Sequence, residues 1–193
     1  MRPHSGFSLI EMLVVLFVVV LMTSLVTLNV NSGANDRVVQ EQLETLTAVA
    51  AYALDEAQFS GSDFGALFAT SMNERGEPTL SVHWRQRLPQ GWRAPAQSRE
   101  IFSSLEFPAN TRLQISLDTV ELLPVAEDAA DPRAGAAPQW LLFSSGETQA
   151  GELVIRDRED DAVLWRLSWD PLGRFRQFRG DSDEALGEYA LAP

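Results

Sequence analysis

The first thirty residues are dominated by one continuous apolar run. Every residue from Met12 to Met22 is apolar, and no formal charge occurs between Glu11 and Asp36. A helix over residues 12–35 would be roughly 36 Å long, enough to cross a ~30 Å hydrocarbon core. We therefore expect a transmembrane helix over residues 7–30. The alternative is a cleaved secretory signal peptide, which a run of this length without a following A-x-A-like site disfavours.

A different pattern follows the apolar run. Apolar residues now recur at spacings of three and four, which predicts one buried stripe along an amphipathic helix over residues 31–60. The stripe consists of Val39, Leu43, Leu46, Ala50, Ala53 or Leu54, and Ala57. Ser60-Gly61-Ser62 is expected to end this helix. It either continues from the apolar run, with a possible break near residues 31–33, or is a separate helix after a short linker.

Residues 61–193 alternate apolar and polar positions over short stretches, which predicts β-strands. The expected strands are 63–70, 80–85, 112–117, 140–143, 153–155, 163–169 and 174–178, with a turn at 170–173. Short strands after one helix imply an α+β fold in which the helix packs on antiparallel sheets. Pro89–Pro95 and Ala126–Pro138 are expected to be irregular. The second is expected to be a mobile loop, either a tolerated insertion or a contact for a partner.

Composition limits the function classes. The 193 residues contain no Cys, which excludes disulfides and thiol chemistry, and 45% hydrophobic residues suffice for the core of one domain over residues 61–193. The net charge is −12. Because residues 1–35 hold one Arg and one Glu, this excess of acid belongs to the rest of the chain. Such a surface disfavours nucleic acid as a partner.

Glu11 is a carboxylate at the start of an otherwise apolar segment. A charged side chain inside a membrane costs on the order of 2.5 kcal/mol or more, so a partner is expected for it. Two interpretations stay open. Glu11 lies hydrated at the membrane interface, or it pairs with a positive charge when chains assemble.

Gly6-Phe7-Ser8-Leu9-Ile10-Glu11, followed by the apolar run, resembles the class III signal of type IV pilins and type II secretion pseudopilins. The resemblance implies a leader over residues 1–6 and cleavage between Gly6 and Phe7 by a prepilin peptidase of the inner membrane. It implies N-methylation of Phe7 as the new amino terminus. It also implies that Glu11 meets the amine of a neighbouring subunit's first residue, which would supply the partner.

A second stretch favours a subtype. Residues 139–147, read as QWLLFSSGE, resemble the strand and turn of the H-type minor pseudopilins, and Trp165–Leu167 with Asp170–Arg174 resemble their closing hairpin. The resemblance implies a pilin-like α+β fold and a structural subunit of the type II secretion pseudopilus, which drives export of folded proteins across the outer membrane. Other minor pseudopilins, the major pseudopilin, the prepilin peptidase and the inner membrane are its implied partners. The alternative is a minor pilin of a type IV pilus, including the DNA-uptake type.

The flanks of the apolar run predict the topology. Arg2 and His4 precede the run without an acid, and the acidic domain follows it. The positive-inside rule then places Met1 in the cytoplasm and the domain across the membrane. Together with the resemblance, this implies a single-pass protein of the inner membrane with a periplasmic domain. After assembly the chain would belong to the pseudopilus.

Catalysis is not expected. The chain has two histidines, and His4 lies in the expected leader. His83 alternates with apolar neighbours on an expected strand, and no nucleophile-elbow motif accompanies it. We expect no enzyme and no cofactor.

Two charged clusters have alternative interpretations. Asp181, Asp183 and Glu188 have oxygen ligands at a spacing that could hold calcium, but they lack an EF-hand pattern, and a charged tail is the favoured interpretation. Residues 157–161 combine acids with interleaved arginines and are expected to form a solvated turn. The arginines 174, 176 and 179 make a small basic spot, on which a DNA-binding alternative would depend. We expect packing or subunit contacts for them, and no metal site.

Overall fold

The computed structural model describes residues 9–96, 100–126, 128, 131 and 135–189, and it leaves the side chains of residues 23–35 and 187–189 outside that description. The chain divides into two compact units, Met1–Arg37 and Val38–Pro193. Within the described part of the chain, no helix has an apolar stretch long enough to cross a membrane.

The single long helix, α1, runs from Leu9 to Ser60. Its backbone is helical through residues 31–33, where the sequence allowed a break. The helix ends as expected, because Gly61 adopts a left-handed φ of 67°, a conformation that glycine accepts without strain. The predicted stripe is confirmed, since all of its members from Val39 to Ala57 are at most 1% exposed.

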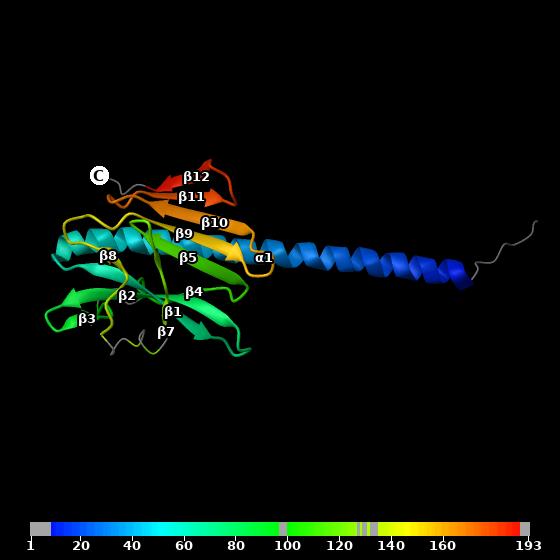
Figure 1. The fold of residues 1–193 in the computed structure, drawn as a ribbon, viewed down its shortest axis with the longest axis horizontal. Helices are drawn as coiled ribbons and strands as arrows, with labels where there is room; N and C mark the ends of the chain where they lie inside the picture. The colour runs from blue at the N-terminus through cyan, green and yellow to red at the C-terminus, as the bar shows by residue number, and fades with distance from the viewer. Residues whose placement is uncertain (1–8, 97–99, 127, 129–130, 132–134, 190–193) are drawn as a thin grey trace, which may run out of the picture. The chain divides into compact units, whose positions relative to one another are not determined.

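Twelve strands, counted over the described residues, form two sheets in the second unit (Figure 1). The first sheet has the order β3-β2-β1-β7, with β4 paired to β2 and β8 paired to β1. The second has the order β12-β11-β10-β9-β5-β6. Neighbouring strands are antiparallel except β1 and β7, which are parallel.

The bounds of the strands follow in chain order. In the first sheet they are β1 Phe64–Met72, β2 Pro78–Leu88, β3 Gly91–Arg93, β4 Leu105–Phe107, β7 Val125–Ala126 and β8 Trp140–Leu142. In the second sheet they are β5 Thr111–Leu117, β6 Val120–Leu122, β9 Gly151–Asp157, β10 Val163–Trp169, β11 Phe175–Arg179 and β12 Ala185–Tyr189. All seven strands expected from the sequence are present, with small shifts at their ends.

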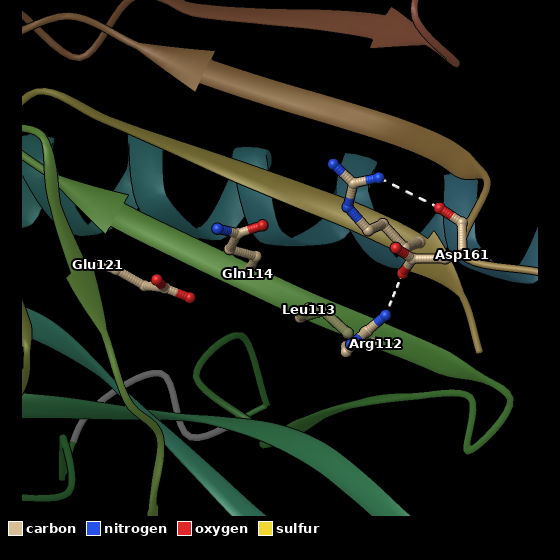
Figure 2. A pocket seen from close by; sticks show the side chains of 6 residues that line it. Arg112, Leu113, Gln114, Glu121 and Asp161 are labelled. Atoms are coloured by element: carbon tan, nitrogen blue, oxygen red, sulfur yellow. Dashed lines mark hydrogen bonds and ion pairs between the residues drawn. The ribbon is translucent and has the colours of Figure 1, made fainter.

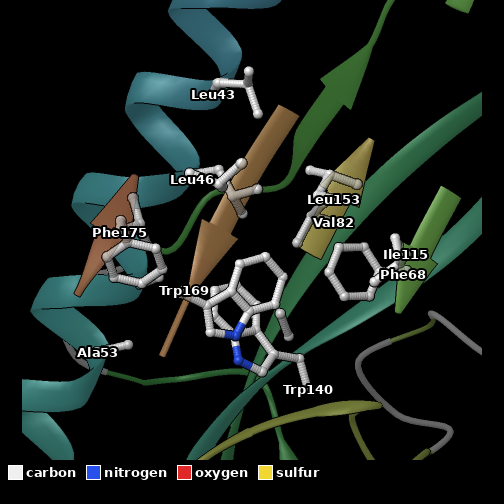
Figure 3. Packing of buried hydrophobic residues seen from close by; sticks show 14 of the residues in the cluster. Leu43, Leu46, Ala53, Phe68, Val82, Ile115, Trp140, Leu153, Trp169 and Phe175 are labelled. Carbon is white, nitrogen blue, oxygen red and sulfur yellow. The ribbon is translucent and has the colours of Figure 1, made fainter. Parts of the chain in front are cut away.

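The core is one continuous cluster that joins the helix stripe to the facing sides of both sheets (Figure 3). At its centre the rings of Trp140 and Trp169 lie 4.4 Å apart, and Phe175 packs against both. Each indole N–H has a partner, because Trp140 Nε1 donates to Thr148 Oγ1 at 2.8 Å and Trp169 Nε1 donates to the Gln149 carbonyl at 2.7 Å. Trp140 and Trp169 are thus buried with the hydrogen-bond donor of each indole ring satisfied.

Two expectations about the first sheet are wrong. Residues 89–95 are not wholly irregular, since β3 lies within them. The strand at residues 80–85 is not half-exposed, because Ser81 and Arg85, expected on a polar face, are 5% and 1% exposed. Burial lowers the pKa of Arg85, and the nearby carboxylate of Asp131 opposes that shift.

The reason is that residues expected in a mobile loop cover the outer face of this sheet. Ala136, from that loop, and Val125, just before it, pack against Leu67 and Ala69, which point away from the main core. A Cβ built at Gly65 would lie 2.5 Å from Pro138 Cγ, so the strand and the covering segment are in direct contact. The expectation of a mobile loop is therefore wrong for residues 135–138.

Candidate assembly segment and the surfaces of the domain

The first unit presents a helical segment that is apolar on every side. From Leu9 to Met22, all thirteen large apolar side chains are between 44% and 85% exposed. A helix that is apolar all round is stable only when lipid or another protein surrounds it. The segment is thus suited to an environment of lipid or of another protein's apolar surface.

Glu11 is the one charged residue within this segment, and its side chain is exposed. It lies in the first turn of α1 as the structure describes it. Carboxylates in the first helical turn are favoured by the helix dipole. Gly6 and Phe7, the expected processing residues, lie outside the described residues, so the cleavage site remains a prediction.

His83 is the histidine outside the expected leader, and the structure shows its surroundings. The His83 ring lies 2.9 Å from Ser81 Oγ, within hydrogen-bonding distance, two residues along the same strand. Ser81 is 5% exposed and its hydroxyl also donates to the Ala69 carbonyl at 3.3 Å. A nucleophile needs access to its substrate, and this hydroxyl is closed off between β1 and β2.

The acids near the C-terminus are partly engaged with arginine. Asp183 forms an ion pair with Arg166 at 3.3 Å. Among the described residues, no group of three metal-ligating side chains comes together. The side chain of Glu188 is not described, so the calcium alternative is not tested in full.

The three arginines of the basic spot occupy different settings. Arg174 lies in the turn before β11 and pairs with Asp170, its Nε 2.8 Å from Oδ2. Arg179 places its guanidinium over the ring of Trp165, 5.8 Å from the centroid. Arg176 lies on β11 opposite Glu188. Arg174 and Arg179 thus make contacts within the domain, in line with the packing interpretation.

The Ser144–Glu147 turn is tied to the end of the helix. Asp63, just past the end of α1, accepts hydrogen bonds from the N–H and the hydroxyl of Ser144 at 2.9 and 3.0 Å. Gly146 has φ of 90°, and a Cβ there would lie 2.9 Å from the Gln58 side chain. The strand and turn that suggested the subtype from sequence therefore form a specific contact with the helix.

Three comparisons with known proteins bear on the family. The family described as "Prokaryotic N-terminal methylation motif" matches residues 1–27. A curated relative, "Type II secretion system protein H" from Aeromonas hydrophila, is 24% identical over 190 residues, which cover 95% of this chain and 100% of the relative.

Solved structures resemble the fold. The crystal structure of the minor pseudopilin EpsH from the Vibrio cholerae type II secretion system covers 73% of this chain and 93% of that one, with 20% identity and a TM-score of 0.53. The solution structure of GspH from E. coli covers 77% and 94%, with 17% identity and a TM-score of 0.49. The first of these supports the expected pilin-like α+β fold. The curated relative is described as a type II secretion protein, not as a type IV pilin.

Proposed function

Since the chain is an H-type minor pseudopilin of type II secretion, a structural protein and not an enzyme, we propose that it is matured between Gly6 and Phe7 and assembles through its N-terminal helix. The methylation motif implies processing by a prepilin peptidase. In the proposed sequence of events the precursor inserts in the inner membrane, loses residues 1–6 and is N-methylated on Phe7. It then joins the pseudopilus beside other minor pseudopilins and the major pseudopilin.

The observation that carries this proposal is the exposed apolar surface of residues 9–22. Lipid would cover this surface before assembly, and the helices of neighbouring subunits would cover it afterwards. Both environments are apolar, so transfer from one to the other costs little hydrophobic free energy. Packing and polar pairing between helices must then decide which state is favoured.

Glu11 supplies the polar pairing in this account. A carboxylate surrounded by apolar side chains is stabilised strongly by a nearby cation, and removing one partner of a buried pair costs ~3–5 kcal/mol. The amine of a neighbouring subunit's Phe7 is the proposed cation. Cleavage after Gly6 creates that amine, so maturation and assembly are coupled.

The test is Glu11→Ala in the full-length chain, expressed with the rest of its secretion system. We expect unchanged recovery in the membrane fraction, with copurification of other pseudopilins reduced by about tenfold or more, in line with the loss of a buried pair. Glu41→Ala, an exposed acid farther along the same helix, serves as the matched control and should assemble normally. Normal assembly of the Glu11→Ala chain would contradict the ion-pair account.

The proposed topology, with the N-terminus cytoplasmic and the domain periplasmic, has its own test. The chain contains no cysteine, so a single Ser145→Cys substitution in an exposed turn gives a unique label site. A membrane-impermeant maleimide should label it in intact spheroplasts. Labelling that requires lysis of the inner membrane would contradict the topology.

A further inference from the structure

A hollow of about 320 Å³ opens beside β5, at the edge of the second sheet (Figure 2). It is lined by Arg112, Leu113, Gln114, Glu121, Arg156 and Asp161. Neither the maturation of the chain nor the packing of its helix uses these residues. Two features of the hollow, the strand edge and the arginines, point to the same kind of occupant.

The first feature is an incomplete strand edge. Strand β9 pairs with the whole of β5, from Thr111 to Leu117, whereas β6 pairs only with Ile115–Leu117. Among the residues that the structure describes, the first half of β5 is therefore paired on one side only, and its residues 112–114 line the hollow. An open edge of this kind can accept an added strand.

The turn between β5 and β6 shows which backbone groups face the hollow. Asp118 and Thr119 both have positive φ, 48° and 70°, as in a two-residue hairpin turn of type I′. In such a hairpin the flanking residues, Leu117 and Val120, exchange backbone hydrogen bonds. Groups two and four residues earlier on β5 point the same way, so the N–H and C=O of Leu113 are directed to the unpaired edge of β5, beside the hollow.

The second feature is a pair of arginines. Arg112 and Arg156 are directly opposite each other on β5 and β9, an arrangement that repulsion between like charges disfavours. Asp161 offsets it, since its carboxylate pairs with Arg112 and its carbonyl accepts from Arg156 Nη1 at 3.1 Å. The Asp161 carboxylate thus pairs with Arg112, whereas Arg156 receives a neutral backbone carbonyl, in a domain that is otherwise strongly acidic.

This local charge favours a second carboxylate. The side chains of the Arg112–Asp161 pair are more than half exposed, so the pair itself contributes little to stability and can rearrange. Guanidinium groups bind carboxylates through paired, directional hydrogen bonds. Glu121, from β6, also lines the hollow, and its negative charge repels a second acid. The incoming carboxylate is therefore expected at the arginine end of the hollow and not beside Glu121.

We propose that this hollow is a docking site for a short extended segment of a neighbouring pseudopilin, which adds to β5 at Leu113 and places an acidic side chain on Arg112 and Arg156. The inference rests on the proposed function, because it requires assembly with other subunits. It adds a contact on the globular domain to the one made by the N-terminal helix. The backbone bonds at Leu113 provide affinity without regard to sequence, and the two arginines provide selectivity for an acid.

The test uses photo-crosslinking in cells that carry the complete secretion system. The photoreactive residue p-benzoylphenylalanine is placed in the full-length chain at Gln114, which is exposed at the hollow, and separately at Val18 in the helix. We expect both positions to give cross-links to other pseudopilins. Mass spectrometry of the Gln114 product should locate the link within two residues of an Asp or Glu.

The arginine pair is tested in the same experiment. Arg112→Ser with Arg156→Ser should lower the Gln114 cross-link about tenfold, which corresponds to 1.4 kcal/mol, and should leave the Val18 cross-link unchanged. Arg75→Ser, in the exposed β1–β2 turn, is the matched control and should change neither. Circular dichroism of the purified double variant checks that the domain remains folded.

Each contrary outcome has a distinct meaning. Cross-links from Val18 but none from Gln114 would overturn the docking site and leave the proposed function intact. A Gln114 cross-link that the double arginine variant does not weaken would overturn recognition of a carboxylate. The absence of cross-links at both positions would contradict the proposed function and the docking site with it.

Discussion

Asp170 shows how one side chain organises a turn of this domain. Its Oδ1 accepts from the N–H groups of Leu172 and Arg174 at 2.9 and 3.1 Å, and its Oδ2 accepts from Arg174 Nε. Partial burial acts to raise the pKa of Asp170, but these hydrogen bonds and the Arg174 charge outweigh it, so the pKa is below its ordinary value. The carboxylate is therefore stabilising only while it is ionised.

This gives a pH-dependent prediction for Asp170→Asn. A depressed pKa in the folded state contributes stability that is present above the unfolded pKa, about 4, and is lost as the pH falls through the folded value. We expect the variant to melt about 2–4 °C below the parent chain at pH 7, since one hydrogen-bonded group contributes ~1 kcal/mol in a domain of this size. Thermal melts in detergent at pH 7 and pH 3 check it, and the difference should shrink at pH 3. A difference that grows in acid would contradict the assignment.

Gly65 tests the contact between β1 and the segment that covers it. An added Cβ would lie 2.5 Å from Pro138 Cγ and 2.6 Å from the Trp140 carbonyl oxygen, and a backbone atom cannot move away cheaply. We expect Gly65→Ala to lower stability by ~1–3 kcal/mol through overpacking, measured by urea unfolding.

Gly76→Ala is the comparison for that substitution. Gly76 has φ of 74° and nothing within 4 Å of an added Cβ, so only backbone strain of ~1–2 kcal/mol opposes the alanine. A smaller loss of stability for Gly65→Ala than for Gly76→Ala would contradict the close packing of Pro138 and the Trp140 carbonyl against Gly65.

At the scale of elements, the sequence predicted best those segments with one strong periodicity. The helix stripe from Val39 to Ala57 and the alternation of Leu113, Ile115 and Leu117 are single patterns, each with one apolar face. The five strands that were missed, β3, β4, β6, β7 and β12, are two to five residues long, too short for a period to be read. Their pairing is decided by the neighbouring strand and not by their own residues.

Burial of Arg85 could not be predicted for a different reason. Its strand alternates apolar and polar residues, which indicates an exposed polar face. That face is covered by residues about fifty positions later in the chain, and the side chain of Gln139 helps to hold them there. Gln139 Oε1 accepts from the Phe68 N–H at 2.7 Å, and its Nε2 donates to the Leu123 carbonyl at 2.9 Å. Such a long-range contact leaves no periodic signal.

The helix stripe makes a prediction at the same scale. Leu43 is fully buried in the main core, and Leu43→Ala should lower the free energy of unfolding by ~2–5 kcal/mol, the usual cost of a cavity. Glu44→Ala, at the next position but exposed, should change it by less than ~0.5 kcal/mol. Urea unfolding of the two variants gives the comparison. Equal effects would mean that α1 does not pack on the sheets through this stripe.

At the scale of the whole molecule, the charge of the chain disfavours nucleic acid as a partner. A net charge of −12 opposes binding to a polyanion, and the arginines 174 and 179 are engaged with Asp170 and Trp165. We expect no salt-sensitive shift of DNA in an electrophoretic assay with micromolar full-length protein, because nucleic-acid binding requires a broad positive patch. A shift that weakens with added salt would contradict this.

The proposed maturation and assembly depend most on the six residues Gly6 to Glu11, which we propose mark the apolar helix for processing and pairing. Mass spectrometry of the intact chain, purified from cells with an active prepilin peptidase, tests this directly. We expect a mature protein that begins at methylated Phe7, and a protein that begins at Met1 when the peptidase is inactive. A chain that still begins at Met1 in the presence of the active peptidase would contradict the central claim.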